Sequence, residues 1–215
     1  MNLNYTIRDI ATAVGGEVIG DPEFVIKHVI IDSRNFFSDS DTLFVAISGT
    51  NNNGHDYIKT LNDRGCSAFI IEKNFANNLP EEAHGIVVQD SLIALQKLAA
   101  HHRSQFSYPV IAITGSNGKT IVKEWLYNIL KKKYNIIRSP KSFNSQVGVP
   151  LSLLQMTHQH SLAIIEAGIS QKGEMAKLAE MIQPTHGILT HIGTAHAVNF
   201  AVSYTHLTLP TKVTV

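Results

Sequence analysis

The sequence of 215 residues has one cysteine, Cys66, and almost no net charge. One cysteine cannot form a disulfide within the chain, which excludes a disulfide-stapled secreted fold and favours a reducing compartment. Eighteen Lys and Arg residues against seventeen Asp and Glu residues leave a formal charge of +1. A balance this close to neutrality gives no broad electrostatic footprint for nucleic acid.

Targeting and membrane-spanning segments are also missing. Residues 1–5 lack the basic and apolar regions of a signal peptide. No apolar run approaches the roughly 18–20 residues that a bilayer-crossing helix needs. We therefore expect a soluble, cytoplasmic protein with no membrane insertion and no nucleic-acid partner.

What the sequence does contain is typical of a globular protein. Hydrophobic residues make up 44% and charged residues 16%, enough to bury a substantial core. The length corresponds to roughly 1.4 average domains, so one large or two small domains are expected. There is no internal repeat and no low-complexity segment.

The first hundred residues predict a mixture of short helices and strands. Thr6 is placed to cap a helix over residues 7–14, which Gly15 and Gly16 would end. Further expected elements are strands at 25–31, 43–47, 68–71 and 86–88, and helices at 57–64 and from 91 onward. Because the polar stretch 101–105 is followed by a new pattern, we predict a domain boundary after residue 105.

From residue 110 the chain alternates strands with helices, which indicates an open parallel α/β sheet. The apolar segment 110–114 is typical of a strand buried on both faces. Six apolar residues at helical spacing predict a helix over 120–133: Ile121, Val122, Trp125, Leu126, Ile129 and Leu130. The remaining expected elements are strands at 136–138, 161–166 and 187–192, and helices at 150–156 and 174–182.

A glycine-rich loop between the first of these strands and its helix is the strongest functional signal. Gly115 and Gly118 allow backbone amides to approach phosphate oxygens, and the helix N-terminus adds a partial positive charge. Lys119 supplies a charge for the β- and γ-phosphates, and the Thr120 hydroxyl can ligate Mg²⁺. Ile113 occupies the place of the first glycine of the usual G-x-x-x-x-G-K-[ST] pattern, so a glycine turn with an incidental lysine is the alternative. The predicted nucleotide-binding residues are Thr114, Gly115, Ser116, Asn117, Gly118, Lys119 and Thr120.

Three polar residues follow later elements and are candidate partners of this loop. Glu166 ends an apolar strand at the sheet edge where ligands bind, although a solvent-facing or helix-capping Glu is equally consistent with the spacing. His196 follows the next expected strand, where a surface histidine is the simpler interpretation. Asn144 alone would be a turn residue. His191 falls within an expected strand and is interpreted as structural.

Together these segments resemble the ATP-dependent Mur ligases. Residues 114–120 are similar to the family's TG[ST]xGK[ST] loop, which also lacks the first Walker glycine. Residues 143–150 resemble N-N-x-x-G-x-P with Ser145 in place of the second Asn, and residues 166–168 resemble E-[MA]-G. Residues 192–196 resemble the end of N-I-x-x-A-H, with His191 in place of its Asn. The resemblance implies Mg²⁺ ligation by Thr120, Glu166 and His196, and catalytic roles for Lys119, Asn144, Glu166 and His196.

The N-terminal part also resembles this family. Asp32-Ser33-Arg34, followed by residues 43–49 and Asn53-Gly54-His55, is similar to its D-S-R…LFVAxxG…DGH pattern, with Asn53 in place of the family Asp. This implies a UDP-binding role for Ser33 and Arg34. Without the resemblance, a solvated turn is the simpler interpretation of residues 32–34.

The implied architecture is a small mixed α/β UDP-binding domain, residues 1–105, followed by part of a P-loop parallel-sheet ATPase domain, residues 106–200. Residues 201–215 match nothing in the family, and we interpret them as foreign sequence on a truncated ligase or, alternatively, as a divergent terminus. Lys212 lies near the place of the family's carbamylated lysine, but its surroundings differ and that role is not assigned to it.

The amino-acid sequences of residues 111–126 and 166–171 most resemble those of the last-acting Mur ligases. This implies ATP-dependent joining of D-alanyl-D-alanine to UDP-N-acetylmuramoyl-tripeptide through an acyl phosphate, in peptidoglycan synthesis, with ATP and Mg²⁺ as cofactors and a monomeric enzyme. Two alternatives remain: a truncated fragment that binds nucleotide without turnover, and a P-loop kinase or GTPase. The N-terminal pattern and the short loop argue against the kinase or GTPase.

Overall fold

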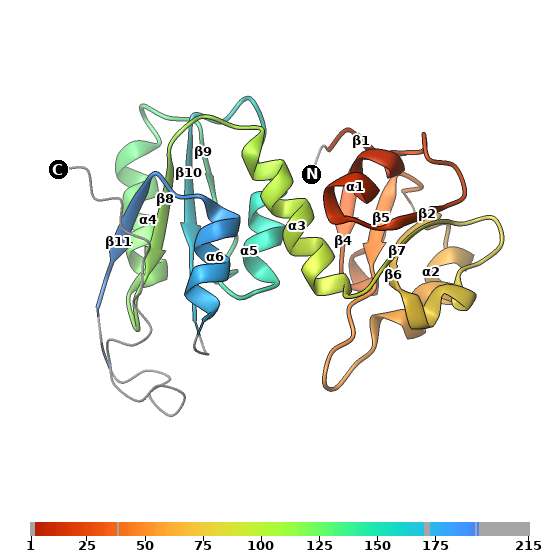
Figure 1. The fold of residues 1–215 in the computed structure, drawn as a ribbon. Helices are drawn as coiled ribbons and strands as arrows, with labels where there is room; N and C mark the ends of the chain where they lie inside the picture. The colour runs from red at the N-terminus through yellow and green to blue at the C-terminus, as the bar shows by residue number, and fades with distance from the viewer. Residues whose placement is uncertain (1–2, 38, 170–172, 192, 194–215) are drawn as a thin grey trace. The chain divides into compact units, whose positions relative to one another are not determined.

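A computed structural model describes residues 3–37, 39–169, 173–191 and 193. The chain forms two compact units, Met1–Leu98 and Ala99–Val215, which divide within helix α3, Ser91–Ser104 (Figure 1). The expected boundary after residue 105 falls just beyond the end of the same helix. The limits 1–105, 106–200 and 201–215 stay predictions, and His196 and the tail lie outside the described residues.

The first unit is built on a five-stranded mixed sheet in the order β2-β7-β6-β5-β4. All neighbours are parallel except β2, which is antiparallel to β7. A separate antiparallel pair joins β1 to β3. The strands are β1 (Tyr5–Thr6), β2 (Glu17–Ile19), β3 (Val25–Ile26), β4 (His28–Ile30), β5 (Thr42–Val45), β6 (Ala68–Glu72) and β7 (His84–Val88).

The two helices that the sequence predicts over 7–14 and 57–64 are present in the first unit. Helix α1, Ile7–Val14, begins at Thr6, whose side chain accepts from the Asp9 amide, and ends at Gly15 with φ of 74°. Helix α2, Ile58–Asp63, packs Ile58 and Leu61 into a cluster of buried apolar residues. Three short 3₁₀ turns complete the unit: η1 (Ser33–Asn35), η2 (Gly54–Tyr57) and η3 (Lys73–Asn78).

The second unit contains a four-stranded sheet in the order β11-β8-β10-β9. Every neighbouring pair is parallel, which confirms the predicted parallel α/β architecture. The strands are β8 (Val110–Thr114), β9 (Ile136–Arg138), β10 (Leu162–Glu166) and β11 (His186–Leu189). All five residues of β10 are buried, as expected for a strand covered on both faces.

Helix α4, Lys119–Leu130, lies on one face of this sheet, and helices α5, Gly148–Leu153, and α6, Glu174–Ile182, lie on the other (Figure 1). Alternation along β8 explains the two layers. Ile111 and Ile113 pack with α4, while Ala112 and Thr114 line a small apolar hole beside α6.

The predicted apolar stripe of α4 is only half right. Val122, Leu126 and Leu130 pack against the sheet, whereas Ile121, Trp125 and Ile129 are 57%, 66% and 72% exposed. The six residues span more than one face of a helix, and only the side carrying the first three reaches the strands. None of the described helices has the length and apolar character needed to cross a membrane.

Candidate functional site

The glycine-rich loop connects β8 to α4 and has the backbone of a phosphate-binding turn. Gly115 and Gly118 have φ of 131° and 85°, a region that favours glycine. Gly118 caps α4 without any side-chain hydrogen bond, which leaves the first amides of the helix for another acceptor. The loop therefore presents backbone donors at a helix N-terminus, where anions bind favourably.

The segment that follows β11 braces this loop. The Ser116 amide donates to the His191 carbonyl at 2.8 Å, and the Gly193 amide donates to Ser116 Oγ at 2.9 Å. A Cβ atom at Gly115 would collide with Thr190 Oγ1 and lie 2.9 Å from the His191 amide nitrogen. Gly115 is therefore required by close packing as well as by its backbone angle.

The bracing corrects the interpretation of His191. Because β11 ends at Leu189, His191 lies beyond the strand, is exposed, and contacts the loop through its main chain. The sequence suggested a strand reaching residue 192, since Ile188 to Ile192 is mostly apolar.

Lys119 begins α4, and its ammonium group donates to the Gly115 carbonyl at 2.7 Å. Partial burial lowers the pKa of Lys119, while the nearby Glu166 carboxylate opposes that shift. The next residue, Thr120, donates from Oγ1 to Glu166 Oε2 at 3.1 Å. The structure thus brings Lys119 and Thr120 of α4 together with Glu166 of β10, all three of them predicted site residues.

Glu166 ends β10 with its side chain fully buried. Its Oε1 lies 2.8 Å from the Nζ of Lys123, which is also fully buried. A buried carboxylate needs such a partner, because taking an unpaired charge out of water is costly. Lys123 was not predicted as a site residue. Its position four residues after Lys119 and three after Thr120 indicates that it lies on the same side of the helix as both.

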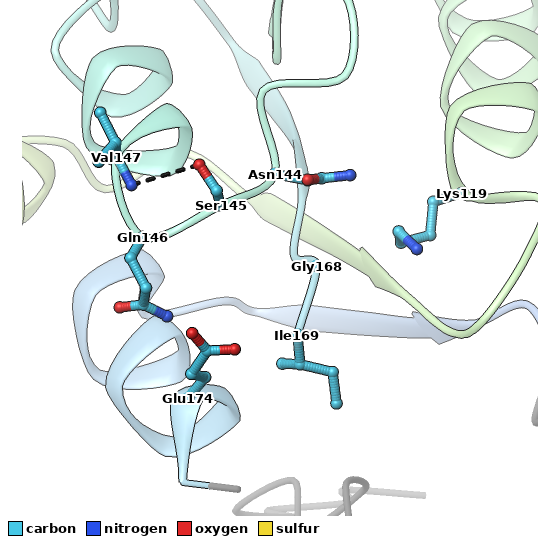
Figure 2. A pocket seen from close by; sticks show the side chains of 8 residues that line it. All are labelled: Lys119, Asn144, Ser145, Gln146, Val147, Gly168, Ile169 and Glu174. Atoms are coloured by element: carbon cyan, nitrogen blue, oxygen red, sulfur yellow. Dashed lines mark hydrogen bonds between the residues drawn. The ribbon is translucent and has the colours of Figure 1, made fainter. Parts of the chain in front are cut away.

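Asn144 lies across a pocket of about 290 Å³ from Lys119, and its side chain extends toward that lysine (Figure 2). The Asn144 carbonyl accepts from the Gly168 amide at 2.7 Å, which ties the loop before α5 to the end of β10. Ser145 Oγ accepts from the Gly148 amide at 3.1 Å. The pocket is lined by Lys119, Asn144, Ser145, Gln146, Val147, Gly168, Ile169 and Glu174, of which Lys119 and Asn144 are predicted site residues.

The oxygen atoms at this edge fit a magnesium ion. Thr120 Oγ1 and Glu166 Oε2 are adjacent, and Mg²⁺ prefers oxygen ligands completed by water and phosphate. Within the described ranges, no cluster of three or more His, Cys, Asp or Glu side chains is present. A protein site of two oxygen ligands suits an ion carried by a nucleotide, and the predicted third ligand, His196, lies outside the described residues.

A second pocket, of about 480 Å³, lies in the first unit at the carboxyl ends of β4 and β5. Its lining residues are Ile31, Asp32, Ser33, Arg34, Ile47, Asn52, Gly54 and Tyr57, so both predicted UDP contacts are among them. The Arg34 guanidinium hydrogen-bonds the Asp32 carboxylate, with Nη2 2.6 Å from Oδ2. These hydrogen bonds lower the pKa of Asp32 to about 2.

Comparison with known proteins gives matches over both units. Residues 25–103 match the catalytic domain of the Mur ligase family, and residues 113–203 match the Mur ligase middle domain. Two curated relatives carry the name UDP-N-acetylmuramoyl-tripeptide–D-alanyl-D-alanine ligase. The Synechocystis sp. protein is 32% identical over 91% of this chain and 43% of its own length, and the Bacillus subtilis protein is 32% identical over 90% and 42%.

Solved structures agree with these matches. A crystal structure of MurF from Acinetobacter baumannii superposes with a TM-score of 0.85 at 30% identity, covering 94% of this chain and 44% of that one. MurF ligase from Thermotoga maritima in complex with ADP gives a TM-score of 0.72 at 31% identity, covering 82% and 40%. The chain therefore spans about two fifths of the length of the relatives it matches.

Proposed function

Because the chain belongs to the Mur ligase family, we propose that it carries the nucleotide and UDP-precursor sites of an ATP-dependent amide ligase. The reaction would join D-alanyl-D-alanine to UDP-N-acetylmuramoyl-tripeptide in peptidoglycan synthesis. The observation that carries the proposal is the convergence of Lys119, Thr120 and Glu166 around a glycine-rich loop at a helix N-terminus. The names of the relatives supply the substrates.

In this reaction no covalent bond to the protein has to form. The terminal carboxylate of the tripeptide attacks the γ-phosphorus of ATP, ADP leaves, and an acyl phosphate forms. The amine of the dipeptide then attacks the acyl carbon, and phosphate leaves. Both nucleophiles belong to substrates, so the protein has to position them and neutralise charge.

Each predicted residue has a place in this scheme. Lys119 and the amides of residues 115–120 would hold the β- and γ-phosphates, and Asn144 would face the transferred group from across the pocket. Thr120 and Glu166 would hold the Mg²⁺ ion, with His196 as the predicted third ligand. Bound Mg²⁺ supplies neutralisation of the phosphate charge.

In the first unit, Ser33 and Arg34 would bind the UDP moiety. Arg34 is 87% exposed at its side chain and forms an ion pair with its near neighbour Asp32, so its guanidinium can turn to a diphosphate. We propose a monomer acting in the cytoplasm, where ATP and the nucleotide-linked precursor are available.

A Lys119→Ala variant tests the nucleotide site. We expect it to abolish ATP binding measured by calorimetry, while Lys132→Ala, at an exposed lysine just after α4, leaves the binding unchanged. Wild-type affinity in Lys119→Ala would contradict the assignment. Arg34→Ala should weaken UDP binding without affecting ATP.

A second candidate follows from the two-fifths coverage: this chain binds nucleotide and does not turn over. The discriminating assay is ADP release that depends on both UDP-tripeptide and D-alanyl-D-alanine. Turnover by this chain refutes the binding-only candidate. Turnover only by a chain extended to the relatives' length supports it.

A further inference from the structure

Lys123 is a fully buried lysine to which the proposed chemistry gives no role. It lies on α4, one turn after Lys119, with an exposed fraction of zero. Its ammonium group lies 2.8 Å from Glu166 Oε1 and donates to the Ser139 carbonyl at 2.9 Å and to the Lys141 carbonyl. An ammonium group has three protons to share among these acceptors, and Glu124 Oε1 lies farther from it, at 3.4 Å.

The contact with Lys123 divides the two oxygens of the Glu166 carboxylate. Oε1 faces Lys123, and Oε2 faces the hydroxyl of Thr120 at 3.1 Å. The Glu166 amide donates to Ser139 Oγ at 3.0 Å, which fixes the main chain at the same point. The carboxylate is therefore held with one oxygen directed at the loop side of the site.

Lys123 also fixes the segment that leads to Asn144. Residues 139–141 supply two carbonyl acceptors to Lys123, and Lys141 has a left-handed φ of 48°, an uncommon conformation for a residue with a side chain. Asn144 follows three residues later and is bound through its carbonyl to Gly168, two residues after Glu166. One buried ammonium group thus joins the helix of the phosphate loop to both other walls of the site.

We propose that Lys123 is a positioning residue that directs Glu166 Oε2 toward the nucleotide-bound Mg²⁺ and sets the loop carrying Asn144. The inference rests on the proposed function, because it assigns Lys123 to the metal side of that same site. Substituting an outer-shell partner of a metal ligand typically costs about 10- to 100-fold in metal affinity or activity. Lys123 should therefore act on the Mg²⁺ dependence of nucleotide binding.

The test is calorimetric titration of the chain with ADP, in EDTA and across a series of MgCl₂ concentrations. For Lys123→Met we expect metal-free ADP affinity within about threefold of wild type and a half-maximal Mg²⁺ concentration raised about 10- to 100-fold. The control Lys132→Met, an exposed lysine beyond the same helix, should match wild type in both measurements. A half-maximal Mg²⁺ concentration that is unchanged or lower in Lys123→Met would overturn the proposal. Equal losses of ADP affinity with and without Mg²⁺ would also overturn it.

A second pair of variants covers the case in which Lys123→Met does not fold. Glu166→Gln and the double variant Lys123→Met/Glu166→Gln leave no unpaired buried carboxylate. If Lys123 acts on Mg²⁺ through Glu166, Glu166→Gln and the double variant should have the same half-maximal Mg²⁺ concentration. A value at least tenfold higher in the double variant would refute the inference. Absence of ADP binding by the wild type would instead refute the proposed function, so the two failures are distinguishable.

Discussion

The two units place a pocket in the same topological position, but the ion pair considered near that pocket is buried in the second unit and exposed in the first. Both pockets lie at the carboxyl ends of parallel strands, after β4 and β5 in the first unit and after β8, β9 and β10 in the second. The ion pair of the second unit, Lys123–Glu166, is 0% exposed on both sides. The pair of the first unit, Arg34–Asp32, is 87% and 31% exposed.

This difference separates two ways of presenting charge to a phosphate-bearing ligand. A buried pair cannot rearrange without leaving a charge unsolvated, so its geometry is fixed before the ligand arrives. An exposed pair is screened by water and can exchange partners at little cost. The second unit is therefore expected to be sensitive to substitutions that leave the first unit nearly unchanged.

The largest expected effect is on the stability of the second unit when its pair is broken. Lys123→Met should cost about 3–5 kcal/mol of unfolding free energy, because Glu166 is left buried without its ion-pair partner. Urea unfolding followed by the fluorescence of Trp125, the single tryptophan of the chain and part of α4, measures this unit. Lys123→Met/Glu166→Gln should recover most of the lost stability. A loss below about 1 kcal/mol in Lys123→Met would show that the buried pair contributes no more to stability than the exposed Arg34–Asp32 pair.

Glycines with positive φ provide the next comparison. Gly115 and Gly65 have φ of 131° and 100°, but only Gly115 has close neighbours, since a Cβ at Gly65 meets nothing within 4 Å. Gly65→Ala should cost about 1–2 kcal/mol from its backbone angle alone. Gly115→Ala adds a collision with Thr190 and should cost more and weaken ADP binding. Hydrogen exchange of β6 and β8 amides measures the two effects, and equal costs would show that the brace on the loop is dispensable.

The features that sequence predicted are those with local signals. The glycine-rich loop with its lysine, between an apolar strand and a helix, is identified from eight consecutive residues. Four apolar residues followed by an acidic one predict that Glu166 ends a buried strand, which is β10. The same locality gave α1 with its Thr6 cap and its Gly15 end. In each case the residue's role is decided by its immediate neighbours along the chain.

What sequence missed depends on contacts between distant segments. All three residues of β2 are exposed, so no alternation marks the strand, and its existence follows from pairing with β7. The expected strand 25–31 is divided at Lys27, whose amide donates to Asp41 instead of to a neighbouring strand. Lys123 lies among the apolar residues of a helix, and only the fold shows that its charge faces Glu166.

A smaller effect is expected from His55, a buried histidine beside the pocket of the first unit. Its Nε2 accepts from the Glu72 amide at 3.0 Å, its Nδ1 lies 2.7 Å from Asn53 Oδ1, and its ring stacks on Phe75. Burial lowers the pKa of His55, while the carboxylates of Glu72 and Asp56 oppose the shift.

The sign of the resulting pH dependence follows from that direction. The folded state keeps His55 neutral, so its contribution is full above the ordinary pKa of about 6.5 and is lost as the pH falls from there toward the lowered folded value. Hydrogen exchange of β6 between pH 7 and pH 5 should show this loss, and His55→Gln should reduce it. Asn53→Asp, which places a carboxylate beside Nδ1, should also reduce it; an unchanged slope in both variants would exclude His55 as the source.

The smallest effect on stability is expected from substituting Asp32, the partner of Arg34 in the exposed pair. The Asp32 pKa of about 2 means that its stabilising pair is present above the ordinary carboxyl pKa of 3.8 and is lost as the pH falls through about 2. At pH 7, Asp32→Asn should cost only about 0.2–1 kcal/mol, because water screens an exposed pair.

Salt should remove this cost and leave that of Lys123→Met in place. In about 1 M NaCl the screening length falls to about 3 Å, which reaches an exposed pair and not one excluded from solvent. Urea unfolding of both variants at low and high salt, with the first unit followed by hydrogen exchange and the second by Trp125 fluorescence, measures the two responses. If Lys123→Met lost its effect in salt as Asp32→Asn does, the Lys123–Glu166 pair would be open to solvent in solution, and Lys123 would have no fixed geometry to impose on the site.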